Sequence, residues 1–212
     1  GMASASWNVT SMPLRAGFGV GAPGFVFGGL DPSATAIAIQ YAADNGANII
    51  SLSFGGAAIG AEEGAINYAH DLNVITFAAA GNNDNDDIDY PAGYDNVIAV
   101  AATDFGDFRA NFTSFGDWVD ISAPGVNIWS TSNVDDGYVR SDGTSMACPN
   151  AAAVAGLVLS VLPELDVDAL EDIMISTCEN IDQINPDYEG LLGAGRINAR
   201  KAILYAGYPV LN

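Results

Sequence analysis

Ser145 is the residue whose surroundings point most clearly to chemistry. It stands in the segment Asp142–Pro149 (DGTSMACP), at the start of a long apolar stretch that predicts a helix. Gly143 allows close approach of a backbone, and the first turn of a helix offers unpaired N–H groups and the positive end of the helix dipole. These features stabilise an oxyanion that forms beside a serine hydroxyl. A serine at a helix start can also be a simple cap, but these neighbours favour a nucleophile.

A serine hydroxyl is a weak nucleophile near neutral pH and needs a base within hydrogen-bond reach. The sequence contains one histidine, His70, which follows Ala65–Ala69 at the end of a predicted helix. An imidazole is favourably placed there against the negative end of the helix dipole. We therefore interpret His70 as a partly exposed helix-end residue and not as the base for Ser145.

The elements that must position Ser145 alternate along the chain. Asp31 followed by Pro32 predicts the N-cap and first residue of a helix that ends before Gly46. Further helices are predicted at Glu62–Asp71, after Gly143, from about Asp166, and up to Gly207. Strands are predicted at Trp7–Leu14, Asn48–Phe54 (covered on both faces), Val74–Ala79, Val97–Thr103 and Asp120–Ala123. This alternation predicts an α/β fold with a parallel sheet, whose active sites lie at the carboxyl ends of strands.

Composition narrows the possible partners. The 212 residues predict one domain, residues 1–212. Twenty-six acidic and six basic residues give a net charge of −20, which repels phosphate backbones and argues against nucleic acid as a partner. The charge indicates either solubility in salty or extracellular surroundings, or cation binding. The apolar stretch Met146–Leu162 is too short for a membrane span and contains Pro149 and Asn150, so it predicts a core helix and no membrane partner.

The segment Gly143–Ala147 (GTSMA) resembles the nucleophile motif of the subtilisin-like serine proteases. The resemblance continues in Ala78–Asn82 (AAAGN), Ser51–Gly56 (SLSFGG), Tyr90–Ala92 (YPA), Val97–Val100 (VIAV), Ala123–Gly125 (APG) and Gly193–Asn198 (GAGRIN). It therefore runs from about Trp7 to Tyr205. It implies a subtilisin-like parallel sheet flanked by helices, a serine endopeptidase activity on peptide or protein substrates, and an extracellular full-length protein.

The resemblance also implies a role for individual residues. Ser145 would attack the peptide carbonyl, and the oxyanion would accept hydrogen bonds from the Asn82 side chain and the Ser145 backbone N–H. Substrate would lie between two walls, Ser53, Phe54 and Gly55 on one side and Ala80 and Gly81 on the other. Asp89 would lie near the base of the specificity pocket. If its side chain points inward, a basic substrate side chain is favoured; if outward, nothing follows.

The family's order of catalytic residues is Asp, His, Ser, and its Asp and His motifs would precede the start of the match. The resemblance thus implies a catalytic domain truncated at its N-terminus and inactive, or nearly so, by itself. Two alternatives stay open: a non-catalytic peptide-binding scaffold, or half of a two-chain protease. The missing strand would lie between Trp7–Leu14 and Asn48–Phe54, so the exposed edge would be covered by the N-terminal segment, a second copy or an N-terminal fragment.

The sequence also suggests two possible cation sites and the state of its two cysteines. No cofactor is required, but Asp84, Asp86, Asp87 and Asp89 form either a Ca²⁺ site or a solvated acidic loop. The family also has a weak cation site of backbone carbonyls, which would map to Ala92, Tyr94 and Val97. Cys148 and Cys178 favour free thiols over one bridge. The chain starts without a secretory signal, and Gly1 before Met2 resembles the scar of a cleaved tag.

Overall fold

A parallel sheet of four strands forms the middle layer of the protein. The computed structural model describes residues 5–22, 25–132 and 137–207, with the side chains of residues 20–27 outside the description; Gly1 also lies outside it. The strands are β3 (Ile49–Leu52), β4 (Ile75–Ala79), β5 (Val97–Thr103) and β6 (Ile121–Pro124), which pair in the order β3–β4–β5–β6. All three pairings are parallel, as the sequence predicts.

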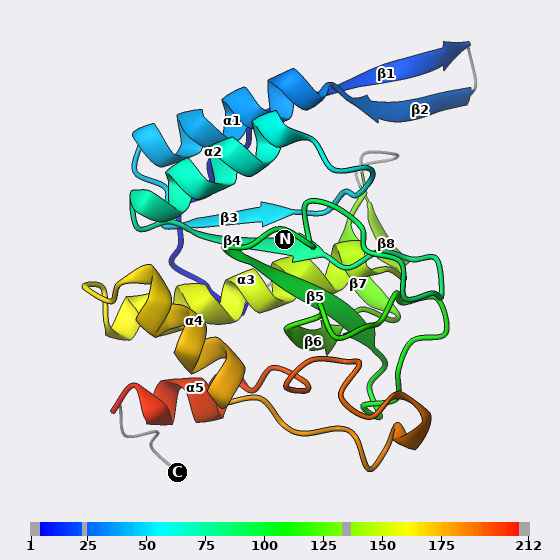
Figure 1. The fold of residues 1–212 in the computed structure, drawn as a ribbon, viewed down its shortest axis with the longest axis vertical. Helices are drawn as coiled ribbons and strands as arrows, with labels where there is room; N and C mark the ends of the chain where they lie inside the picture. The colour runs from blue at the N-terminus through cyan, green and yellow to red at the C-terminus, as the bar shows by residue number, and fades with distance from the viewer. Residues whose placement is uncertain (1–4, 23–24, 133–136, 208–212) are drawn as a thin grey trace.

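Helices cover both faces of this sheet (Figure 1). Helices α1 (Pro32–Asp44) and α2 (Gly60–Asp71) pack side by side on one face. Helices α3 (Thr144–Val161), α4 (Val167–Ser176) and α5 (Ala199–Tyr205) lie on the other, where α3 contacts all four strands. A short 3₁₀ helix, η1, spans Pro186–Tyr188. The predicted α/β architecture is confirmed.

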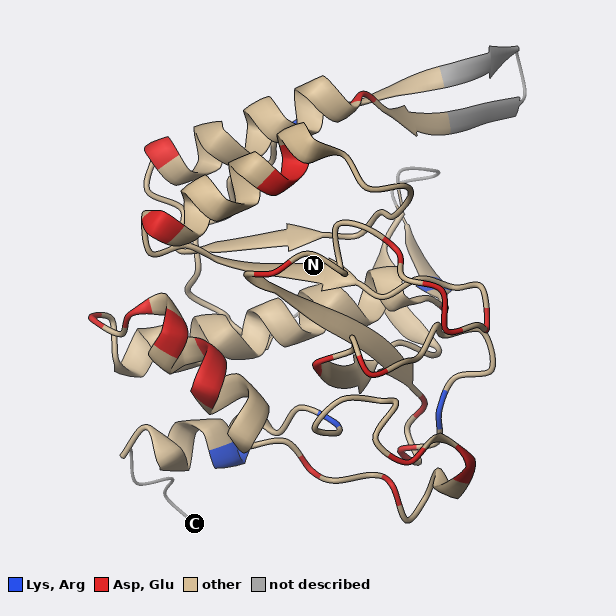
Figure 2. Ribbon diagram, in the orientation of Figure 1, with Lys and Arg blue, Asp and Glu red and all other residues tan. Residues whose placement is uncertain are grey.

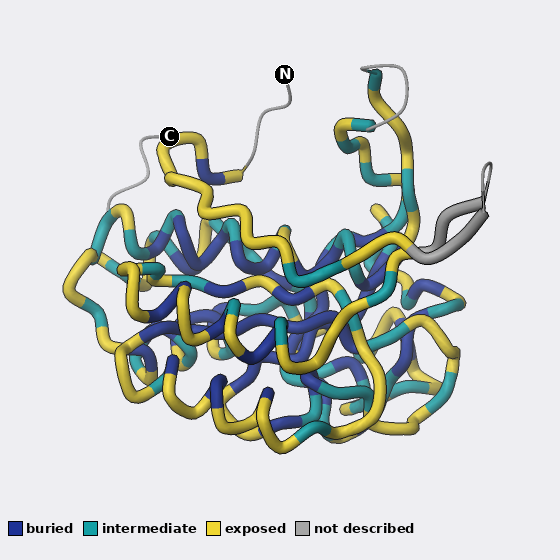
Figure 3. Tube along the Cα trace, turned by 90° about the horizontal axis from the view of Figure 1, so that it is seen from above, coloured by how far each residue is buried: buried dark blue, intermediate teal, exposed yellow. Residues whose placement is uncertain are grey.

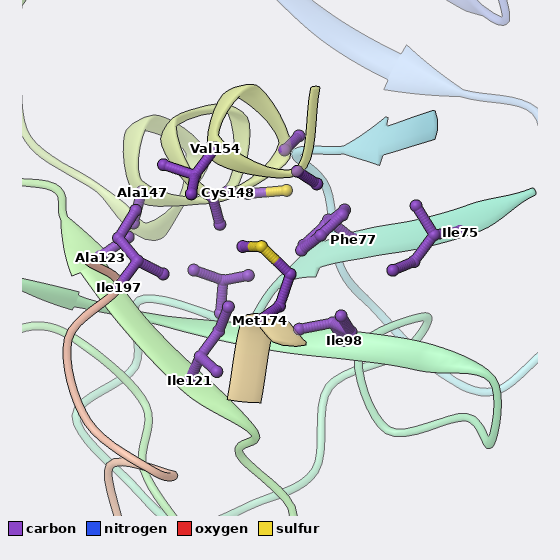
Figure 4. Packing of buried hydrophobic residues seen from close by; sticks show 14 of the residues in the cluster. Ile75, Phe77, Ile98, Ile121, Ala123, Ala147, Cys148, Val154, Met174 and Ile197 are labelled. Carbon is purple, nitrogen blue, oxygen red and sulfur yellow. The ribbon is translucent and has the colours of Figure 1, made fainter. Parts of the chain in front are cut away.

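The alternating side chains of β4 and β5 build two apolar layers. Phe77 and Ile98 point to the α3 face, where Met174 of α4 reaches the same layer (Figure 4). Ala78 and Ala99 point to the α1–α2 face. Figure 3 shows the buried residues in the middle of the molecule and exposed residues on the outer surfaces of helices and loops. Burial on both faces explains why these two strands are apolar along their whole length.

Two antiparallel hairpins were not predicted. Strands β1 (Gly17–Ala22) and β2 (Phe25–Leu30) form one that extends away from the layers (Figure 1); both strands are rich in glycine. Strands β7 (Ile128–Thr131) and β8 (Tyr138–Ser141) form the other. The β7 and β8 side chains are half-buried or exposed, so neither strand has the apolar run that marks the central sheet.

The predicted strand at Trp7–Leu14 is wrong. These residues belong to no strand. Directly before them, the Ser6 hydroxyl donates to the Ala153 carbonyl of α3 and ties the segment to that helix. In the described part of the chain, no backbone hydrogen bond joins this segment to β3. The segment therefore lacks the neighbouring strand that a ladder of hydrogen bonds needs.

A groove of about 1130 Å³ separates the N-terminal segment from the free edge of β3. Its walls come from the N-terminal segment, α1, residues 45–52 with Phe54, and the Gly156–Ser160 part of α3. Helices pack on both faces of β3, but Ser51 is exposed, so this strand is less completely covered than predicted. The exposure follows from the open edge of the sheet.

Helix α3 holds the buried centre of the fold. It is long and apolar enough to meet the length and composition of a membrane span, but Ala147, Ala151 and Ala155 are fully buried in the layer against the sheet. It therefore packs as the predicted core helix. Cys148 on α3 and Cys178 are both free. Burial raises the pKa of the Cys148 thiol to about 11 and that of Cys178 to about 12, so both thiols are neutral near pH 7.

Candidate active site

Three segments meet at the carboxyl edge of the sheet. Ser53–Gly55 follow β3, Ala80–Asn82 follow β4, and Ser145 is the second residue of α3. The Ser53 hydroxyl donates to the Ser145 carbonyl (2.9 Å), and the Ser145 hydroxyl lies 3.4 Å from the Ser53 carbonyl oxygen. The first wall and the nucleophile predicted from the sequence are thus in direct contact.

Gly143 gives Ser145 an open approach. Its φ of +155° is one that residues with side chains rarely adopt. A Cβ atom added to Gly143 would lie 3.6 Å from the Ser145 backbone nitrogen and 3.8 Å from Asn82 Nδ2. Both nitrogens therefore border one space beside the nucleophile. Two N–H donors around a common space form an arrangement that can stabilise an oxyanion.

Asn82 is fixed in the orientation that this chemistry needs. Its Oδ1 accepts hydrogen bonds from the Thr144 N–H (2.9 Å) and the Thr144 hydroxyl (3.0 Å). A backbone N–H can only donate, so Oδ1 must face Thr144 and the Nδ2 group must face away from it. No described residue accepts a hydrogen bond from Nδ2. The Asn82 amide is therefore an available donor next to Ser145.

Thr144 is a positioning residue that the sequence reasoning missed. It is fully buried, and its hydroxyl also accepts the Gly81 N–H (3.2 Å). It thus links the segment after β4 to the start of α3. The signal was present in the sequence, because a hydroxyl side chain directly precedes Ser145 at the helix start, where hydroxyls bond to nearby backbone groups.

The two predicted cleft walls face different surroundings. Ser53 and Gly55 are exposed, and Phe54 is half-buried against the α1–α2 layer. Ala80 is fully buried, and its N–H donates to the Val100 carbonyl (3.0 Å). Gly81 has a φ of +109° and is half-buried. The first wall is therefore accessible from solvent, whereas the second wall is held to the sheet by a backbone hydrogen bond.

Asp89 lies between the two walls. A Cβ atom added to Gly55 would lie 3.2 Å from Asp89 Cγ, and one added to Gly81 would lie 2.6 Å from Asp89 Oδ2. Burial, and then the neighbouring carboxylate of Asp87, raise the pKa of Asp89. Of the two orientations left open by the sequence, the structure has the carboxyl group pointing inward.

His70 lies away from Ser145. It is in the last turn of α2, before β4 begins, and therefore at the amino edge of the sheet. Its Nε2 lies 3.2 Å from Asp168 Oδ1, and its side chain is 21% exposed. This is the partly exposed helix-end position predicted from the sequence.

Two of the four carboxylates of the acidic loop, those of Asp84 and Asp87, have separate partners. Arg109 pairs with Asp84 and lies over the rings of Phe115 and Tyr188, and Asn85 donates to Asp87 (2.7 Å). Within the described ranges, no three His, Cys, Asp or Glu side chains are grouped to hold a metal ion. The Ca²⁺ site stays a prediction.

The predicted carbonyl site lies in the connection from β4 to β5. Ala92 and Tyr94 are buried in this loop, and Val97 is the first residue of β5. Their side chains pack into the α1–α2 layer, which places the backbone close to the sheet edge. Cation binding by these three carbonyls stays a prediction.

Comparison with known proteins identifies the family to which this arrangement of residues belongs. The model of the subtilase family, Peptidase_S8, matches residues 18–195. This chain belongs to the subtilase family. It is 40% identical to thermitase from Thermoactinomyces vulgaris over 175 residues, which cover 82% of this chain and 60% of thermitase. It is 41% identical to the halolysin-like extracellular serine protease Nep from Natrialba magadii over 177 residues, or 83% of this chain and 32% of that protein.

Solved structures show the same subtilase fold. The prenylagaramide maturation protease PagA superposes with a TM-score of 0.77 and 29% identity, over 84% of this chain and 68% of that one. The self-cleaved protease domain of PatA gives 0.75 and 30%, over 84% and 69%. In length, the chain spans less than two thirds of thermitase and less than one third of Nep, the two relatives named above.

Proposed function

We propose that this subtilase chain supplies the nucleophile and the oxyanion-binding half of a serine endopeptidase, and that the chain alone is inactive or nearly so. The observation that carries the proposal is the convergence of the free Asn82 amide and the Ser145 N–H beside the Ser145 hydroxyl. In acyl transfer, Ser145 Oγ bonds to the peptide carbonyl carbon while the carbonyl oxygen becomes an anion between these donors.

The missing function is proton removal. The described neighbour of the Ser145 hydroxyl is the Ser53 carbonyl oxygen, which is a poor base. The single histidine of the sequence is paired with Asp168 at the other edge of the sheet. A base from outside this chain is therefore required for rapid attack by Ser145.

Labelling with a fluorophosphonate probe tests this division of labour. We expect the purified chain to label hardly faster than a Ser145→Ala control. Adding a polypeptide with the family's Asp and His motifs should raise Ser145-dependent labelling. Rapid labelling of the chain alone would show that a base is already present, and the half-site proposal would fail.

The groove beside β3 favours the addition of a further strand to the free edge of the sheet. A strand added there would lie between α1 and α3, so both of its faces would be covered, and a buried parallel strand is apolar on both faces. An N-terminal fragment or a second copy of the chain could supply it. Light scattering separates the two, because a dimer forms in the pure chain and a complex with a fragment does not.

A second candidate function is peptide binding without cleavage. Ser53 and Gly55 are exposed beyond the unpaired edge of β3, where an extended peptide can add as a strand. A chain that binds peptide tightly, and stays unlabelled when the Asp and His motifs are added, would favour this scaffold function. As in the extracellular and cell wall-associated relatives, we propose that either function is exercised outside the cell.

A further inference from the structure

Asp89 closes the space between the two cleft walls. Its carboxyl group fits there because both wall residues, Gly55 and Gly81, lack a side chain: a Cβ on either would lie within 3.2 Å of it. These walls also border the site itself, since Gly55 follows the Ser145-bonded Ser53, and Gly81 precedes Asn82. A side chain that enters between the walls therefore meets Asp89 next to the nucleophile.

The backbone around Asp89 is firmly held. Gly56 and Tyr90 exchange two backbone hydrogen bonds, of 2.9 and 3.0 Å, directly beside it. The Asp89 carbonyl accepts from the Gly93 N–H (2.9 Å). This pairing joins the loop that carries Asp89 to the first wall, so the fold holds the Asp89 backbone beside that wall.

The Asp89 carboxylate itself is unpartnered. In the described part of the chain, no donor bonds to it and no cation pairs with it, whereas Arg109 pairs with Asp84 and Asn85 bonds to Asp87 on the same loop. The group is half-buried, and its pKa is raised mainly by burial. A partly desolvated anion without a donor gains most from a ligand that brings a cation.

Resting on the proposed function, we propose that Asp89 makes this cleft select a basic side chain, Lys or Arg, at the substrate residue whose carbonyl faces Ser145. The ammonium or guanidinium group donates hydrogen bonds to the Asp89 carboxylate between Gly55 and Gly81. The peptide carbonyl of that residue then lies beside the Asn82 and Ser145 donors. An apolar or acidic side chain leaves the carboxylate unpaired in the same space.

Equilibrium binding measures this preference directly, because a chain without a base leaves the peptide intact. Two short fluorescent peptides are compared by anisotropy, identical except for arginine or its neutral isostere citrulline at one position. We expect the full chain to bind the arginine peptide at least about tenfold more tightly. Asp89→Asn should bind both peptides alike, with citrulline binding retained as proof that the variant is folded.

Non-specific attraction is the main confounder, since a net charge of −20 attracts any basic peptide. Asp86→Asn removes one charge from the same loop without touching either wall, and it should keep the arginine preference. Equal affinity of the unmodified chain for both peptides would overturn the role of Asp89 while leaving the cleft in place. Failure to bind either peptide would overturn the cleft, and with it the proposed function.

Discussion

Thr144 connects two parts of the site through a single hydroxyl group. The Gly81 N–H donates to it, and it donates in turn to Asn82 Oδ1, which also accepts the Thr144 N–H. Residues that follow β4 are thereby fixed to residues that begin α3. The orientation of the Asn82 amide depends on this short chain of hydrogen bonds, and not on any contact with substrate.

Removal of this hydroxyl should be costly. We predict that Thr144→Val lowers the free energy of unfolding by about 1–3 kcal/mol, because the Gly81 N–H loses its acceptor and Asn82 loses one donor. Urea denaturation measures the change. Thr103→Val is the matched control: the Thr103 hydroxyl is buried without a partner in the described structure, so this variant should be neutral or more stable. Equal losses in both would refute the argument.

At the scale of elements, α1 starts with a strong local signal. Asp31 Oδ1 accepts from the Ser33 N–H (2.8 Å) and the Ala34 N–H (3.2 Å), and Pro32 occupies the first turn. We predict that Asp31→Ala lowers the free energy of unfolding by about 1 kcal/mol. Asp31→Asn keeps the cap and removes the charge, so thermal or urea unfolding should show little change. A loss as large as that of Asp31→Ala would assign the effect to charge.

Local signals of this kind explain which elements were predictable. Asp31 caps α1 as expected, and α4 begins next to Asp166, where a helix start was predicted. The apolar run Val97–Thr103 coincides with β5 because every residue in it is buried. The segment Trp7–Leu14 failed because a strand depends on a partner that the segment itself does not encode. The hairpin β7–β8 lacks an apolar run, so periodicity gave no sign of it.

The candidate site also has some features that the sequence predicted and others that only the folded structure reveals. Motif residues Ser145 and Asn82 were predicted as a pair, since the resemblance names both. The bond that orients them, from Thr144, and the inward direction of Asp89 both depend on how separate loops meet. Tertiary contacts of this kind leave no periodic mark in a sequence, and only the assembled carboxyl edge of the sheet reveals them.

Two half-buried carboxyl groups, Asp120 directly before β6 and Glu171 on α4, are expected to make stability depend on pH. Burial is the main cause that raises the pKa of Asp120. Burial also raises the pKa of Glu171, and repulsion by the Asp120 carboxylate raises it further. A raised folded pKa means that the folded state binds protons more tightly than the unfolded chain. We therefore predict that stability rises as pH falls from about 7 towards these raised values.

Urea midpoints across this pH range measure the effect. Asp120→Asn keeps an oxygen that can accept the Ala99 N–H but cannot ionise, so its pH dependence should be flatter. Glu179 acts in the opposite direction, because Lys201 and Asn198 lower its pKa. Its stabilisation is lost only as pH falls through that lowered pKa, below the range considered. An unchanged slope in Asp120→Asn would exclude Asp120 as a cause of the pH dependence.

At the scale of the whole molecule, the charges are too uneven to neutralise one another. Carboxylates cover α2, α4 and the loops beyond the sheet, while basic residues are few (Figure 2). The described residues contain three ion pairs of Lys or Arg with a carboxylate, formed by Arg109, Arg196 and Lys201. Most acidic side chains therefore repel one another, and this repulsion opposes the compact state.

Screening of this repulsion gives the last prediction. The Debye length falls from about 30 Å at 0.01 M salt to about 10 Å at 0.1 M, so the melting temperature should rise steeply over that range and level off above it. Thermal melts in NaCl and KCl should coincide, because screening depends on ionic strength and not on ion identity.

A bound cation would make the melting temperature depend on the ion that is present. Stabilisation by low-millimolar CaCl₂ beyond the effect of its ionic strength would support a Ca²⁺ site at Asp84–Asp89. A difference between the melting temperatures in Na⁺ and K⁺ would support the carbonyl site at Ala92. A melting temperature that ignores salt altogether would show that charge repulsion is negligible despite the net charge of −20.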